Sequence, residues 1–147
     1  MKNLVIPKET YHFPGITVIV PRQLDIVPVD KGHTPGSIQS MPPQFTLIRY
    51  VANIVFYHKT DIHGEPVTDF DPPVEFRVGY NFEDLLESKF NNKPLLLAYW
   101  DSRAIPPQWI MVSDDAHEYQ LLPTSTGQVA EFKTWYWPGD PAIAWGK

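Results

Sequence analysis

Sixteen prolines are spread through the 147 residues of this chain, about twice the usual share. Proline has no backbone N–H and clashes with the preceding helical turn, so it breaks helices but is tolerated in turns and at strand ends. This distribution favours short strands joined by turns over long helices. The first 43 residues form a proline-punctuated N-terminal segment.

Hydrophobic periodicity gives the clearest strand near the middle of the chain. Apolar and polar residues alternate from Val74 to Tyr80, with Glu75 and Arg77 on the polar face. A period of two is typical of a strand with one buried face. Residues 95–100 are instead continuously apolar, which predicts a strand that is buried on both faces or lies in a sandwich core.

Shorter alternating runs, separated by turn residues, predict further strands over 15–20, 24–29, 45–58, 108–112, 118–122, 128–137 and 142–145. In the longest run, alternate residues are expected to share one face: Ile48, Tyr50, Ala52, Ile54 and Phe56. A short helix is predicted over 81–92, with Asn81 as its cap. The expected fold is all-β, a single antiparallel immunoglobulin-like β-sandwich domain spanning 1–147 with one short helix.

Composition excludes several kinds of function. The chain is 43% hydrophobic and 20% charged, as globular domains are. Its net charge of −5 argues against a nucleic-acid partner, because phosphates demand a basic face. With no cysteine, disulfides and thiolate zinc sites are excluded. Apolar runs are too short for a signal peptide or a membrane span, so we expect a soluble chain, extracytoplasmic if it is a fragment of a surface protein.

The best metal candidate is a group of residues around one predicted turn, namely His58, Asp61, His63 and Glu65. Imidazole with carboxylate suits zinc or another first-row metal. The competing interpretation is a plain turn, for which Asp61 and Gly64 are favoured residues. We prefer the turn and expect no metal site.

Other candidate chemistry is weaker. Asp69 with Asp71, and Asp114 with Asp115 and Glu118, offer oxygen ligands but lack the spacing of a calcium loop. The sequence contains no nucleophile elbow and no glycine-rich phosphate loop. We therefore expect no catalytic residues, no enzymatic activity and no cofactor.

The strand that ends at Trp137 is the stretch with functional promise. Regular alternation places Glu131, Lys133, Trp135 and Trp137 on one face. Two tryptophans beside a charged pair indicate an exposed aromatic strip, typical of a partner surface or of a stacking platform for sugar rings. The competing interpretation, which we prefer, is that these tryptophans cover one end of the sandwich, or that a bulge reverses the alternation. Trp100 and Trp109, in the hydrophobic middle, are expected in the core.

Several of these stretches resemble one known module. Residues 64–67, Gly-Glu-Pro-Val, and 70–80, Phe-Asp-Pro-Pro-Val-Glu-Phe-Arg-Val-Gly-Tyr, are similar to the middle of a β-sandwich module found beside death domains in ankyrins, netrin receptors and tight-junction scaffolds. Looser relatives occur in bacterial surface proteins. Four more stretches fit the same pattern: 16–21, 82–85, 95–101 and Trp109. The resemblance implies a non-catalytic interaction or structural module, and no binding residues transfer with it.

Two functions of different class follow. The first is a non-catalytic protein-interaction or structural module, acting within a larger protein or assembly through a protein partner or self-association. The second is a carbohydrate-binding module that uses Trp135, Trp137 and Trp145, with Lys133 and Glu131 beside them. Ring exposure separates the two, because a sugar platform needs accessible rings whereas an assembly contact covers them.

Overall fold

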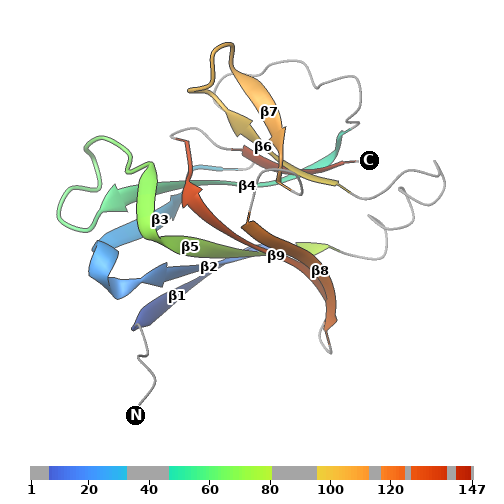
Figure 1. Ribbon diagram of the computed structural model, residues 1–147, viewed down its shortest axis with the longest axis horizontal. Coiled ribbons are helices and arrows are strands. Elements are labelled where there is room, and N and C mark those ends of the chain that lie inside the picture. Colours follow the sequence, from blue (N-terminus) through green and yellow to red (C-terminus); the bar gives the residue numbers. More distant parts are fainter. Residues whose placement is uncertain are drawn as a thin grey trace.

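The computed structural model describes residues 7–32, 47–80, 96–112, 117–124, 127–138 and 142–146. These residues form two five-stranded antiparallel sheets (Figure 1). The first sheet has the order β1 (Lys8–Phe13), β2 (Ile16–Pro21), β5 (Asp69–Tyr80), β9 (Gly127–Tyr136) and β8 (His117–Thr124). The second has the order β3 (Ile26–Asp30), β4 (Leu47–His58), β10 (Ala142–Gly146), β6 (Leu96–Asp101) and β7 (Gln108–Met111). The predicted all-β class is confirmed.

Strand β1 is the element that the sequence patterns do not predict. It forms a hairpin with β2 through Pro14 and Gly15, and Gly15 has φ +77°. Proline followed by a residue with positive φ fits a type II turn. A single 3₁₀ turn, η1 (Arg22–Leu24), then leads from β2 to β3. The helix predicted over 81–92 lies outside the described residues.

The main core lies between the sheets, and Phe76 is at its centre. The Phe76 ring centroid is 4.9 Å from that of Phe132, 4.6 Å from that of Trp137 and 6.0 Å from that of Phe56. Aromatic side chains bury more area than any others, so this group dominates the packing energy. The predicted inward row of β5 is confirmed, since Val74, Phe76 and Val78 are all fully buried.

A second, smaller cluster lies on the far face of the second sheet. Leu97 belongs to the main core, whereas its neighbours in β6 pack with Trp109, and adjacent strand residues point to opposite faces. Trp100 and Trp109 are buried here, with ring centroids 5.7 Å apart. Tyr50 also packs on this cluster.

The position of Tyr50 corrects the predicted face of β4. Ala52 pairs with Ile143 and Tyr50 with Ala144, so the register shifts between these two pairs. Such a bulge reverses the alternation of side chains. Ala52 therefore faces the main core, and Tyr50 faces away from it.

Candidate functional site

A groove opens on the outer face of the first sheet because β2 and β5 separate at one end. Their ladder ends with Ile19 paired to Glu75. The same register, continued by two residues, would set Pro21 opposite Pro73. Neither residue has an N–H, so the bonded pair that the ladder needs at this point cannot form. The sequence thus ends the ladder with two prolines and leaves a gap between the strands.

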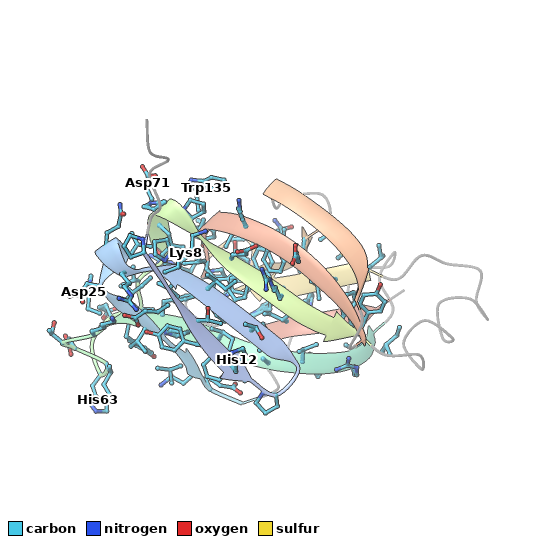
Figure 2. The ribbon with its side chains drawn as sticks, turned by 90° about the horizontal axis from the view of Figure 1, so that it is seen from below. Lys8, His12, Asp25, His63, Asp71 and Trp135 are labelled. Carbon is cyan, nitrogen blue, oxygen red and sulfur yellow. The ribbon has the colours of Figure 1, made fainter. Side chains whose placement is uncertain are left out.

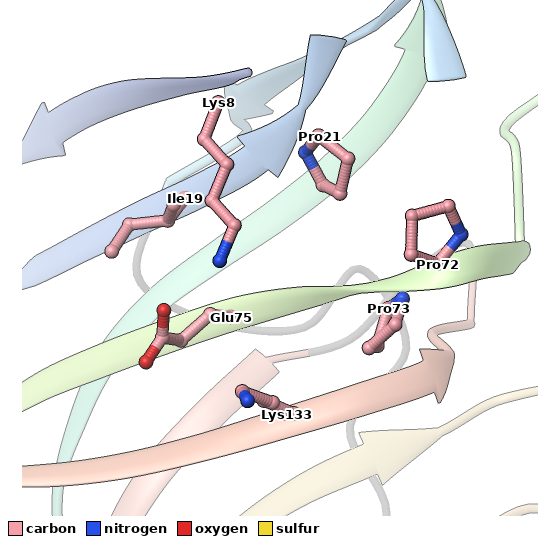
Figure 3. A pocket seen from close by; sticks show the side chains of 7 residues that line it. All are labelled: Lys8, Ile19, Pro21, Pro72, Pro73, Glu75 and Lys133. Atoms are coloured by element: carbon pink, nitrogen blue, oxygen red, sulfur yellow. The ribbon is translucent and has the colours of Figure 1, made fainter. Parts of the chain in front are cut away.

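The groove has a volume of about 170 Å³ and draws its lining from four strands (Figure 3): Lys8, Ile19, Pro21, Pro72, Pro73, Glu75 and Lys133. The register sets Lys133 directly across from Glu75. In Figure 3 the ammonium groups of Lys8 and Lys133 lie on either side of the Glu75 carboxylate. The lining of the groove therefore combines two cations and one anion with an apolar part made of Ile19 and three prolines.

A bulge in β5 brings the prolines to this position. Asp69 pairs with Tyr136 and Val74 with Thr134. Between these pairs, β5 has the residues numbered 70, 71, 72 and 73, while β9 has Trp135 alone. Trp135 thus stands opposite the bulge, and 40% of its surface is exposed. Figure 2, which looks onto this sheet, shows Trp135 near the same end as Lys8 and Asp71.

An ion pair lies next along the outer face. Arg77 and Glu131 are paired across β5 and β9, and Arg77 Nε is 3.1 Å from Glu131 Oε1. Both side chains are partly exposed, and such pairs contribute little to stability. Glu131 therefore lies beside the groove but is already occupied by Arg77.

The predicted aromatic strip is wrong. Trp137 is 1% exposed and Trp145 is 0% exposed, and both belong to the main core. The alternation breaks at the end of β9, where Thr134 Oγ1 donates to the carbonyl of Tyr136 and accepts from its N–H at 3.2 Å. Trp135 keeps the outward position that regular alternation gives it, whereas Trp137 turns into the core.

Three of the five predicted binding residues therefore share the outer face of the first sheet: Glu131, Lys133 and Trp135. The groove residues of β1, β2 and β5 have no counterpart in the sequence prediction. Only the unusual proline pair Pro72–Pro73, inside an alternating strand, marks this place in the sequence.

The residues considered as metal ligands lie in and around a hydrogen-bonded turn after β4. Asp61 donates its N–H to the carbonyl of His58 at 3.0 Å, and Gly64 donates to that of Asp61 at 3.3 Å. The Asp61 carboxylate folds against Gly64, where an added Cβ would lie 2.2 Å from Oδ2. Within the described ranges, no three His, Cys, Asp or Glu side chains converge on a metal position. Of the calcium candidates, Asp114 and Asp115 lie outside those ranges.

Asp101 is a buried acid, and one oxygen of its carboxylate accepts hydrogen bonds from the turn that follows it. Asp101 Oδ1 accepts hydrogen bonds from the N–H of Arg103 at 2.9 Å, the N–H of Ala104 at 3.1 Å and the hydroxyl of Tyr136 at 3.3 Å. Burial, and then the charge of Asp101, raise the pKa of Tyr136. This geometry fixes the connection between β6 and β7, and it is a structural role.

Among the residues that the structure describes, no helix is long and apolar enough to cross a membrane. The expected kinship with the module of ankyrins and netrin receptors stays a prediction. Comparison with protein-family models, with curated proteins and with solved structures gives no match for this chain.

Proposed function

We propose that this chain is a non-catalytic, immunoglobulin-like β-sandwich module that binds a segment of a partner protein in the groove of its first sheet. The observation that carries the proposal is the lining of the groove, which combines Pro21, Pro72 and Pro73 with the two cations Lys8 and Lys133. The immunoglobulin-like assignment has support from the antiparallel pairing of every strand and from the repeated passage of the chain between the two sheets.

The size of the groove favours a peptide. Pockets for small molecules usually measure about 300–1,000 Å³, whereas this groove measures about 170 Å³. It has room for one or two side chains of an extended segment. Its prolines and Ile19 suit an apolar side chain, and Lys8 and Lys133 suit a neighbouring carboxylate. Trp135, at the rim, is of the residue type that most often dominates protein interfaces.

The same geometry disfavours a sugar platform. Polysaccharide recognition by stacking gains from several accessible rings in a row. All five tryptophans lie in the described ranges, and Trp135 is the one that is exposed. Trp137 and Trp145, which the carbohydrate hypothesis needs, are in the core. We therefore place protein binding first, and sugar binding becomes an outcome of the test.

The test uses a displayed library of random peptides, selected on the full chain. We expect selected peptides to combine an acidic residue with an adjacent apolar one. Lys133→Ala and Trp135→Ala should each weaken their binding at least tenfold, and added salt should weaken it further. Because Trp135 is the exposed indole, bound peptide should also reduce quenching of its fluorescence by acrylamide.

Lys31→Ala is the matched control, because Lys31 lies 5.0 Å from the centre of the Tyr57 ring in the second sheet and not in the groove. It should bind the peptides as the wild type does. Equal binding by wild type, Lys133→Ala and Trp135→Ala would overturn the proposal. Protection of Trp135 by soluble polysaccharides, with no peptide selected, would favour the carbohydrate function instead.

A further inference from the structure

Strand β1 is at the edge of the first sheet, so within the described residues one of its sides has no partner strand. Its bonds to β2 fix which backbone groups face outward. Arg22 donates its N–H to the carbonyl of Pro7 at 2.9 Å, and the register continues with Lys8 opposite Pro21. Pro7 thus faces β2. In an antiparallel ladder, every second residue after it does the same.

The three residues between these bonded positions point their backbone groups away from β2: Lys8, Thr10 and His12. Each has both an N–H and a carbonyl, so the edge carries three donors and three acceptors in an unbroken row. The side chains of all three are exposed. Prolines mark the limits of the row, Pro7 before it and Pro14 after it. An edge of this kind is a template for the addition of another strand.

Strand β3 is an edge of the second sheet, and it is less able than β1 to accept a further strand. Lys31 donates to the carbonyl of Asn53 at 2.8 Å, in register with the ladder between β3 and β4. Counting back by twos, the outward-facing residues of β3 are Ile26, Pro28 and Asp30. Pro28 has no N–H, so an added strand would lose its central bond.

The two remaining edges are also less suited to a further strand. Strand β7 has only four residues, and β8 carries Pro123 near its end. Natural proteins use short strands and prolines to block edge pairing. The edge of β1 is therefore the one that combines at least six residues with an outward row free of proline.

We propose that β1 is a homodimerisation strand, which pairs antiparallel with β1 of a second copy about a two-fold axis at Thr10. Thr10 would face Thr10 of the second copy, and Lys8 would face its His12. This register uses all six outward groups of each copy. A shift that sets Thr10 opposite His12 would bring Lys8 opposite Pro14, which cannot donate. Lys8, Thr10 and His12 of the two copies therefore pair entirely among themselves in this register alone.

The side chains agree with a second copy as the occupant. Threonine facing threonine is a favourable cross-strand pair. On the inner face, Glu9 would lie opposite Tyr11 of the second copy, and within one chain the Tyr11 hydroxyl already donates to the Glu9 carboxylate. Two such hydrogen-bonded pairs would meet across the axis. A two-fold contact of this type closes on itself, and a single strand pair is a small interface, so the dimer is weak.

The axis position offers a sharp test. Thr10 is exposed, so Thr10→Glu and Thr10→Lys should fold normally, which circular dichroism checks. Each variant sets two like charges face to face and should weaken dimerisation at least tenfold in sedimentation equilibrium. An equimolar mixture of the two variants sets glutamate opposite lysine and should restore the dimer. Thr60→Glu, in the exposed turn after β4, should dimerise as the wild type does.

Two outcomes would overturn the proposal. One is a wild-type chain that stays monomeric up to the highest soluble concentration. The other is dimerisation of Thr10→Glu as tight as that of the wild type, which would place the contact elsewhere. Lys133→Ala and Trp135→Ala should keep the dimer, so failure of the groove proposal and failure of this one are separable.

Discussion

The indole N–H of Trp137 donates a 2.9 Å hydrogen bond to the carbonyl of Ile54 and so joins the end of the first sheet to a central strand of the second. Trp145 makes the reciprocal bond, from the second sheet to the carbonyl of Gly79 in the first, also at 2.9 Å. Both rings are buried. The two tryptophans therefore combine packing with hydrogen bonds between the layers.

Replacement of either indole by a benzene ring should separate these roles. Trp137→Phe keeps an aromatic ring but leaves the buried carbonyl of Ile54 without this donor, so it should lower the free energy of unfolding by about 1–3 kcal/mol. Trp145→Phe should cost less, because Arg49 Nη2 also donates to the carbonyl of Gly79, at 3.3 Å. Trp135→Phe, on the surface, should change it by less than about 0.5 kcal/mol. Urea denaturation measures all three. Equal losses at Trp135 and Trp137 would contradict the assignment.

Asp101 should be needed for its acceptor and not for its volume. Asp101→Ala removes the partner of the N–H groups of Arg103 and Ala104, and should cost about 2–3 kcal/mol of unfolding free energy. Asp101→Asn keeps one acceptor oxygen and should cost less. Glu65→Gln, in an exposed turn position, is the control. If Asp101→Ala is as stable as the wild type, the hydrogen bonds to Asp101 do not stabilise the fold.

Tyr11 should make the fold sensitive to alkali. Burial, and then its hydrogen bond to Glu9, raise the pKa of Tyr11 to about 12. An unfolded tyrosine ionises near pH 10, so the unfolded state loses its proton first. The stability that this group contributes is present below about pH 10 and is lost as the pH rises to about 12.

The variant Tyr11→Phe should therefore show a smaller fall in its urea midpoint across that pH range. Burial also raises the pKa of Tyr80 and Tyr136, so part of the fall should persist. An identical fall in wild type and variant would show that Tyr11 ionises alike in both states.

The two prolines that end the β2–β5 ladder can be tested by giving them back an N–H. The double variant Pro21→Val, Pro73→Val should extend the ladder by one hydrogen-bonded pair, between positions 21 and 73, and should narrow the groove. We expect both new amides to be protected in hydrogen exchange. Rapid exchange of both would mean that another feature holds the strands apart.

The strands that could be predicted are those in which apolar and polar residues alternate, because this alternation shows which side chains are buried. In β5, Val74, Phe76 and Val78 face the core in turn, and period two reports this directly. Strand β1 gives no such signal. Its inner face includes Glu9, and Tyr11 and Phe13 are only half-buried, so an apolar row is absent from its sequence.

The groove could not be predicted because it depends on register between distant segments. Pro21 and Pro73 come together only once β2 pairs with β5, and nothing local to either proline specifies that meeting. The orientation of Trp137 failed for a related reason. Hydrogen bonds between the Thr134 side chain and the backbone of Tyr136 break the alternation. The presence of a threonine in the sequence does not predict such hydrogen bonds.

Pro28 bears on what kind of assembly the molecule can build. Two receptive edges on one molecule would let copies stack without end into a fibre, the hazard of any open β-protein. Because Pro28 lies at the centre of β3, that edge cannot accept a further strand. Assembly through β1 therefore stops at the dimer.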